Sequence, residues 1–206
     1  VPALCANLAA KGYVAIAWDM VGYNDTRQVA HEFGDYPEAH DWLFHPMGLQ
    51  LWNSIRVLDY VAALPEVDSQ RIGMTGASGG ATQTILLTAV DDRIAVSAPV
   101  VMVSTNFQGD DDCERAPGLR VGTSNVEIAA MMAPRPMLLV SASGDWTRRT
   151  PSAEFPAIRN VYALYGKADA VRSAHFDTGH NYNRSSRAVV YEFFGKHLFG
   201  MSAAPI

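Results

Sequence analysis

The segment that most constrains this chain is Arg71–Ala89, which carries the pattern G-x-S-x-G at Gly76–Gly80. Such a pattern also occurs in flexible turns, so the flanking segments decide whether it is a flexible turn or a nucleophile elbow. Arg71–Thr75 is short and mostly apolar, which predicts a buried strand, whereas Ala81–Ala89 lacks Pro and Gly, which predicts a helix. A strand that turns directly into a helix strains its corner residue, and neighbouring glycines relieve the crowding. We therefore expect Ser78 at the tip of a nucleophile elbow, with its hydroxyl exposed at a helix N-terminus.

The remaining apolar segments alternate between strand and helix patterns. Strands are expected at Tyr13–Trp18, Ile94–Val103, Met137–Ser141 and Val171–Phe176. Helices are expected at Val1–Ala10, Met47–Leu64, Pro151–Leu164 and Asn183–Leu198. Strands that alternate with helices over this length predict an α/β fold with a mainly parallel sheet flanked by helices.

Length and composition narrow the class of protein. A chain of 206 residues, 49% hydrophobic and 18% charged, predicts one globular domain over residues 1–206. A net charge of -5 without a long basic run gives no reason to expect a nucleic-acid partner. No apolar stretch is long enough to span a bilayer, so we expect no membrane partner. Cys5 and Cys113 are compatible with one bridge or with two free thiols, and oligomeric state and compartment stay open.

Two segments are expected to lie over the site rather than in the sheet. Residues 29–46 are rich in His, acids and aromatics, and His31-Glu32 begins like the zinc motif H-E-x-x-H. Asp35 stands where the second His of that motif belongs, and Gly34 and Pro37 oppose the helix it needs, so we expect a surface loop and no metal. The other histidines and acids of this stretch are His40, Asp41 and His45.

Residues 104–134 are the least regular of the chain and predict an excursion over the active site, with Asp110–Asp112 as a solvated face.

A serine nucleophile needs a general base and a third group that orients this base. His180 is the favoured base because it follows the last expected strand, after a Gly and within a polar loop. Asp145 is the favoured acid, since it comes directly after the strand that ends near Ser141. Asp169 and Asp177 remain alternatives for the acid. His175 is expected within a strand, and His197 on the outer face of the last helix.

Four motifs together resemble the α/β-hydrolase superfamily. They are Gly76–Gly80, the run APRPMLLV at Ala133–Val140, Gly144-Asp145-Trp146-Thr147, and Gly179-His180-Asn181-Tyr182. Within the superfamily, the chain is most similar to bacterial acetyl xylan esterases and dienelactone-hydrolase-like proteins.

This resemblance implies a catalytic triad of Ser78, Asp145 and His180, with the backbone N–H of Gly79 as one oxyanion donor. Trp146 is expected to contact the substrate. The resemblance also implies a soluble protein that needs no cofactor. It is compatible with a secreted or periplasmic protein and leaves the compartment open.

The resemblance implies one further strand that this sequence lacks. The family's topology places that strand between Tyr13–Trp18 and the strand before Ser78, and its following loop carries the second oxyanion donor. We therefore expect a sheet without its N-terminal strands and with a gap inside it. Either the chain is a fragment of a longer protein, or another segment fills this gap.

The function expected from these residues is hydrolysis of carboxylic esters through an acyl-enzyme. The substrate would be a short acyl ester, such as an acetyl ester, of a carbohydrate or small molecule. Two alternatives stay open: a serine peptidase on the same fold, and a catalytically inactive relative that serves as a binding module.

Overall fold

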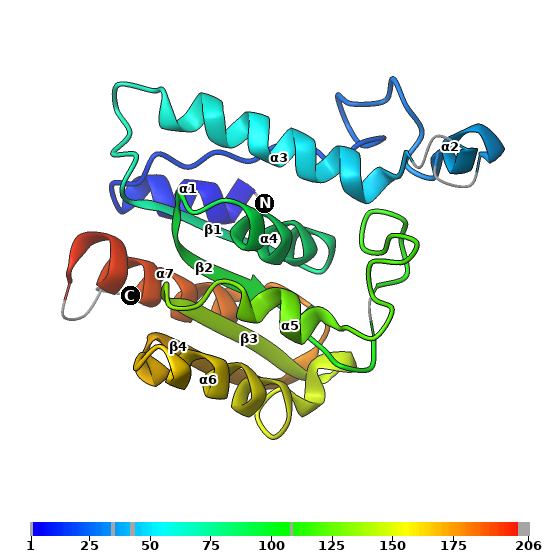
Figure 1. Cartoon of the computed structure of the whole chain (residues 1–206). Coiled ribbons are helices and arrows are strands. Elements are labelled where there is room, and N and C mark those ends of the chain that lie inside the picture. The colour runs from blue at the N-terminus through cyan, green and yellow to red at the C-terminus, as the bar shows by residue number, and fades with distance from the viewer. Residues whose placement is uncertain (1, 34–35, 42–43, 108, 202–206) are drawn as a thin grey trace.

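A computed structural model describes residues 2–33, 36–41, 44–107 and 109–201 of the chain (Figure 1). Its centre is a sheet of four parallel strands in the order β1-β2-β3-β4. The strands span Ile72–Ala77 (β1), Ile94–Val100 (β2), Met137–Gly144 (β3) and Val171–Gly179 (β4). The register places Thr75 opposite Ala98 and Leu139 opposite Ser173. The predicted α/β class with a mainly parallel sheet is confirmed.

Helices cover both faces of this sheet (Figure 1). One face carries α3 (Pro46–Ala62), α4 (Gly79–Val90), α5 (Asn125–Ala130) and α6 (Glu154–Leu164). The opposite face carries α1 (Pro2–Ala10) and α7 (Arg184–Phe199). Three shorter helices lie outside these layers: α2 (Pro37–Asp41), η2 (Trp146–Arg149) and η3 (Ala168–Ala170). Among the described residues, no helix combines the length and the apolar character needed to cross a bilayer.

Each face of the sheet has its own apolar core. Ile85 and Leu87 of α4 and Tyr162 of α6 pack in the first core, and the Tyr162 hydroxyl donates to the Arg135 carbonyl at 2.7 Å. The second core joins β2 and β3 to Phe193 and Phe194 of α7. Because both faces of the sheet are covered, its strands read as continuous apolar runs rather than as alternating ones.

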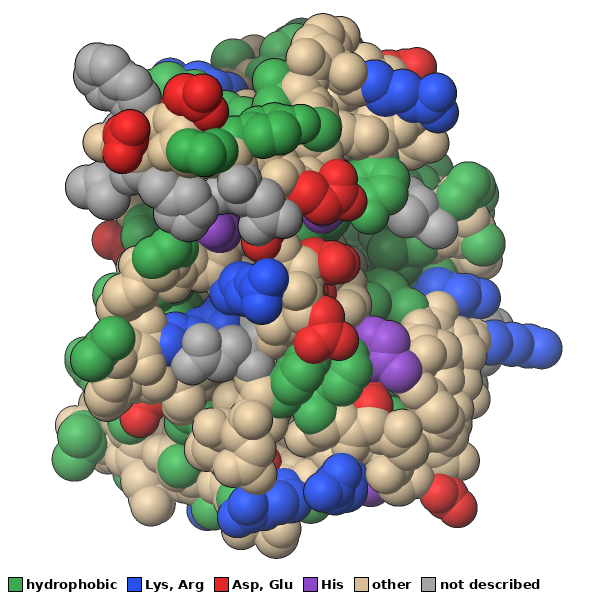
Figure 2. Space-filling view, turned by 90° about the vertical axis from the view of Figure 1, so that its right-hand side faces the viewer, with side chains coloured by type: hydrophobic (Ala, Val, Ile, Leu, Met, Phe, Trp, Pro, Cys, Tyr) green, Lys and Arg blue, Asp and Glu red, His purple; other side chains and the backbone are tan. Residues whose placement is uncertain are grey.

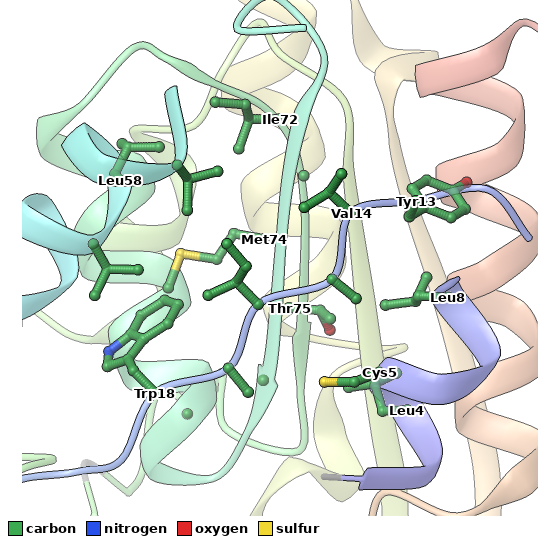
Figure 3. Close-up of a pocket in the computed structure, with 18 of the residues that line it drawn as sticks. Leu4, Cys5, Leu8, Tyr13, Val14, Trp18, Leu58, Ile72, Met74 and Thr75 are labelled. Carbon is green, nitrogen blue, oxygen red and sulfur yellow. The ribbon is translucent and has the colours of Figure 1, made fainter. Parts of the chain in front are cut away.

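The strand predicted at Tyr13–Trp18 is wrong for this structure. The segment is extended and runs beside β1 (Figure 3), yet it forms no strand. Its N–H and C=O groups have no strand within reach, because β1 pairs only with β2 and a cavity of about 690 Å³ separates β1 from residues 13–19. An extended segment becomes a strand only through a hydrogen-bonded neighbour. The predicted gap inside the sheet is therefore present, and we call it the β1 gap.

The region 104–134 is more regular than predicted, because it contains α5. Ser124 caps this helix with its side chain, which accepts from the Val126 N–H, while the Glu127 carboxylate accepts from the Ser124 N–H at 2.8 Å. This reciprocal arrangement is a capping box, and its sequence signature S-x-x-E was visible at Ser124–Glu127. The rest of the region consists of turns.

Candidate active site

Ser78 occupies a sharp turn between β1 and α4, as the sequence predicted. Its backbone has φ 54° and ψ -123°, in a region that costs a non-glycine residue about 1–3 kcal/mol. The Ser78 N–H donates to the Val100 carbonyl at 3.1 Å, which ties the turn to the end of β2. A Cβ on Gly76 would lie 2.4 Å from the backbone of Gly80, so only glycine fits there. Glycine at position 76 thus permits the turn that presents the Ser78 hydroxyl.

His180 and Asp145 form a hydrogen-bonded pair at the same end of the sheet as this turn. The Nδ1 of His180, directly after β4, lies 2.8 Å from Oδ2 of Asp145, directly after β3. Asp145 is only 8% exposed, and its other oxygen accepts from the Thr147 N–H at 2.7 Å. Because a carboxylate can only accept, Nδ1 carries the proton of this hydrogen bond, and in a neutral ring Nε2 keeps a lone pair. A histidine held in this way can accept a proton at Nε2.

The alternative acids and histidines lie elsewhere. Asp169 is an exposed residue 3.6 Å from Arg159, and Asp177 accepts from the Ser143 hydroxyl at 2.5 Å. His175 lies within β4, as predicted, and its Nδ1 is 2.8 Å from the Ser141 hydroxyl. His197 packs against the ring of Phe193 in α7.

Trp146 packs directly against the histidine of this pair. The centroids of the Trp146 and His180 rings are 4.4 Å apart, and the Phe107 ring packs against Trp146 at 4.3 Å. The indole N–H of Trp146 is buried without a hydrogen-bond partner in the described structure. The three rings form one apolar wall of the site.

Glu114 contacts Ser78, the candidate nucleophile. Nothing in the sequence indicated this contact. The Ser78 hydroxyl donates to Oε1 of Glu114 at 3.0 Å, and the Asp110 N–H donates to Oε2 at 3.1 Å. Burial raises the pKa of the Glu114 carboxyl above its usual value, although both hydrogen bonds lower it. No local pattern marks Glu114, because it lies in an irregular loop that only the tertiary fold brings to Ser78.

The side chains nearest the backbone of Gly79 complete the site. A Cβ on Gly79 would lie 2.9 Å from the end of Met20 and 3.4 Å from both the Cys113 sulfur and Oε1 of Glu114. Figure 2 views the face where the strands end, on which acidic, histidine and apolar side chains gather around a hollow. Gly79 begins α4, so its N–H has no partner within the helix and is free to donate to an anion.

One group of side chains near the site has the chemistry of a metal-ligand set. One donor atom each from His31, Asp111 and Cys113 lie within 4.8 Å of one another. The Nδ1 of His31 lies 2.6 Å from the Val21 carbonyl, while its Nε2 is buried without a partner. Cys5 and Cys113 are both free thiols. Of the other histidines and acids weighed for a metal, Asp35 and the His40 side chain lie outside the described residues.

The comparisons with known proteins point to one superfamily. The model of the acetyl xylan esterase (AXE1) family matches residues 38–113. YtaP of Bacillus subtilis (strain 168), which carries the name of a hydrolase, is 30% identical over 202 residues, covering 86% of this chain and 64% of YtaP. Among solved structures, the methylesterase BT1017 is 38% identical with a TM-score of 0.70, covering 80% of this chain and 40% of that one. The chain has the α/β-hydrolase fold and is similar to esterases of this superfamily.

A more distant structure confirms the fold of this superfamily. A glucuronoyl esterase of carbohydrate esterase family 15 from Caldicellulosiruptor kristjansonii superposes with a TM-score of 0.68 at 20% identity, over 89% of this chain and 58% of that one. The chain therefore spans less than two thirds of the length of YtaP and of both esterases. The α/β-hydrolase fold and the resemblance to esterases, both expected from the sequence, are confirmed.

Proposed function

We propose that this α/β-hydrolase chain carries the catalytic residues of a serine carboxylic-ester hydrolase that works through an acyl-enzyme. The observation that supports it most is the pair of His180 and Asp145, held at 2.8 Å at the same end of the sheet as the strained turn of Ser78. These three residues follow the carboxyl ends of β1, β3 and β4, where parallel α/β sheets bind their ligands. The order Ser, Asp, His along the chain is that of the superfamily.

The proposed reaction has two halves. In the first, Nε2 of His180 takes the hydroxyl proton of Ser78 while Oγ attacks the ester carbonyl. The tetrahedral oxyanion is stabilised by the Gly79 N–H at the start of α4. The intermediate then expels the alcohol, which takes the proton from His180 and leaves Ser78 acylated. In the second half, water gives a proton to His180 and attacks the acyl carbonyl. The bond to Oγ of Ser78 then breaks, His180 returns the proton to this oxygen, and the acid is released.

One rearrangement must precede the attack. The hydroxyl of Ser78 donates to Glu114, so it has to rotate toward Nε2 of His180 before it can lose its proton. A substrate carbonyl that enters beside Gly79 would approach the same Glu114 oxygen. We therefore propose that substrate binding moves the Glu114 side chain away from the nucleophile.

The substrate class proposed is an ester of a carbohydrate, by similarity to the acetyl xylan esterase family, and the methylesterase adds methyl esters to the candidates. These two relatives differ in which side of the ester is small. An acetyl esterase releases acetate from a large alcohol, whereas a methylesterase releases methanol from a large acid. The 38% identity to the methylesterase makes methyl esters the second candidate beside the acetyl esters expected from the sequence.

The function is tested with matched ester substrates on the protein as its gene encodes it. We expect hydrolysis of p-nitrophenyl acetate, and of either acetylated xylan or a methyl-esterified polysaccharide, to be lost in Ser78→Ala. Release of acetate or of methanol identifies the substrate class. Hydrolysis that persists unchanged in Ser78→Ala would contradict the proposed nucleophile.

A covalent probe separates the esterase from the inactive alternative. A fluorophosphonate should add one phosphonyl group to Ser78 in the wild type and react much more slowly with His180→Ala. A protein that is not labelled would instead favour the catalytically inactive binding module. Cleavage of peptide substrates but not of esters would favour the serine peptidase.

A further inference from the structure

A buried histidine close to Ser78 has one ring nitrogen without a partner. His31 is only 6% exposed, and its Nδ1 lies 2.6 Å from the Val21 carbonyl. Because a carbonyl only accepts, Nδ1 carries the proton of this hydrogen bond, and in the neutral ring Nε2 keeps a lone pair. This Nε2 is buried without a hydrogen-bond partner among the described residues. A buried polar atom without a partner destabilises the fold, so a group that binds Nε2 would stabilise the protein.

The surrounding fold holds this histidine in one orientation. Gly22 has φ +87°, and a Cβ on it would lie 2.4 Å from the backbone nitrogen of His31, so glycine lets the two segments pack together. The Tyr23 ring packs against the imidazole with centroids 4.6 Å apart. The Val21 N–H donates to Oε1 of Gln50 in α3 at 2.7 Å, which anchors the carbonyl partner of Nδ1. Histidines that bind metals commonly donate their other ring N–H to such a carbonyl, because this bond fixes the tautomer.

Asp111 and Cys113 bring a carboxylate and a thiol to this histidine. One donor atom from each of the three side chains lies within 4.8 Å of the other two. A tetrahedral zinc ion holds nitrogen, oxygen and sulfur ligands about 3.4–3.6 Å apart, so the three side chains need to close by about 1 Å. Cys113 is buried and Asp111 is exposed, which gives an ion a path from solvent to the buried donors.

The donor set indicates which kind of metal ion fits. Magnesium and calcium take oxygen ligands, whereas imidazole nitrogen and thiolate sulfur are ligands of zinc. The ionised Asp111 and a Cys113 thiolate would together carry two negative charges, which a divalent ion balances. We propose that His31, Asp111 and Cys113 bind one zinc ion. On binding, the ion replaces the proton of the Cys113 thiol, which leaves to solvent, and three protein ligands leave the fourth position of the ion open.

The proposed ion would join two loops beside the nucleophile. His31 belongs to the loop after residues 13–19 and Cys113 to the loop that carries Glu114, and Figure 1 shows both loops on the side to which β2 points. The sulfur atoms of Met20 and Cys113 lie 3.9 Å apart, and a Cβ on Gly79 would lie 3.4 Å from the Cys113 sulfur. Of residues 29–46, only His31 belongs to the proposed set, because the fold supplies the other two ligands from far along the chain. The ion would therefore clamp the loop that places Glu114 on Ser78.

Metal titration tests the proposal without reference to catalysis. The protein as its gene encodes it is stripped of metal with a chelator and titrated with Zn²⁺ by calorimetry, and we expect one tightly bound equivalent. Cobalt(II) in place of zinc should give a thiolate-to-cobalt charge-transfer band in the near ultraviolet. Loss of a ligand should cost at least as much affinity as loss of an outer-shell partner, so Asp111→Asn and Cys113→Ser should each weaken zinc binding about 100-fold. Cys5→Ser is the matched control, since Cys5 is the other free thiol and lies in α1.

Thermal unfolding gives a second readout. At a free zinc concentration about 100-fold above the Kd, binding to the folded state should raise the melting temperature by about 5 °C or more. The same concentration should raise that of Asp111→Asn by only about 1 °C, because the Kd of this variant is higher. Asp111 is exposed, so its replacement leaves the core intact and provides a folded variant even if Cys113→Ser does not fold.

Three outcomes would overturn the proposal. The first is a protein that binds no equivalent of zinc, and the second is equal zinc affinity in wild type and Asp111→Asn. The third is a cobalt band that disappears in Cys5→Ser and persists in Cys113→Ser. Ser78→Ala should bind zinc as the wild type does while it loses ester hydrolysis, so failure of the zinc site and failure of the proposed function are distinguishable.

Discussion

The hydroxyl of Ser78 donates a hydrogen bond to Glu114 at 3.0 Å, while the His180 side chain is oriented by Asp145. The proposed nucleophile and its proposed base are thus each engaged, but with different carboxylates. Glu114 competes for the proton that His180 needs to remove. Because of this competition, Glu114 is the first residue to replace in a test of the proposed mechanism.

Replacing Glu114 by Gln should raise activity at neutral pH. An ionised carboxylate accepts a stronger hydrogen bond than an amide does, by about 1 kcal/mol or more, and it repels the oxyanion. We therefore expect kcat/KM on a neutral acetyl ester to rise about 5-fold at pH 7 in Glu114→Gln. A rate that falls in this variant would show that the carboxylate assists the reaction.

The same substitution should change how stability depends on pH. Burial raises the pKa of Glu114 in the folded protein, so the folded state binds a proton more tightly than the unfolded state. Its contribution to stability is therefore fully present below the unfolded pKa and is lost as pH rises through the higher folded pKa. Urea unfolding at pH 4 and pH 7 should show that Glu114→Gln gains stability relative to wild type at the higher pH. Parallel curves for the two proteins would contradict the raised pKa.

Replacing Asp145 by Asn should lower kcat about 10³-fold to 10⁴-fold, because an amide can donate to Nδ1 and favours the wrong tautomer of His180. Initial rates on p-nitrophenyl acetate measure this loss. Asp177→Asn is the matched control, since Asp177 contacts Ser143 and not His180. If Asp177→Asn lost the larger share of activity, the assignment of the acid would be reversed.

Alanine at Gly76 and at Gly80 should have opposite effects on stability. A Cβ at Gly76 would lie 2.4 Å from the backbone of Gly80, and such overpacking costs about 1–3 kcal/mol. A Cβ at Gly80 meets nothing within 4 Å, and alanine stabilises a helix relative to glycine by about 0.5–1 kcal/mol. Denaturant midpoints for the two variants measure the difference. Similar losses at both positions would mean that the turn is not as tight as described.

Trp146→Ala should reduce activity by removing the ring that packs on His180 at 4.4 Å. If Trp146 also contacts substrate, KM rises as well as kcat falling, and Trp146→Phe recovers most of the loss. Trp52→Ala serves as a control, because Trp52 is an exposed residue of α3 that packs against Arg56. Unchanged kinetics in Trp146→Ala would remove Trp146 from the site.

Local sequence patterns predicted most of the described fold, because these elements depend on residues that lie close together in the chain. The turn at Ser78 follows from glycine spacing, and β2 and β3 follow from apolar runs that only a covered sheet accommodates. The positions of Asp145 and His180 follow from where those strands end. Their meeting at 2.8 Å could be expected because the carboxyl ends of parallel strands share one edge.

The features that the sequence missed depend on partners far along the chain. Residues 13–18 have the composition of a strand, but strand formation also needs a neighbour, which the described chain does not place beside them. Glu114 reaches Ser78 through a loop with no repeating pattern. By contrast, α5 was missed although its capping box was visible at Ser124, because the surrounding turns obscured a helix of only six residues.

The open edge of β1 also bears on how the 206-residue chain behaves in solution. Unpaired strand edges next to apolar side chains are templates on which a second chain can add its own strand. Two copies could thus satisfy one another's free edges. A preparation of this chain should therefore be checked for oligomers by size-exclusion chromatography with light scattering before its activity is measured.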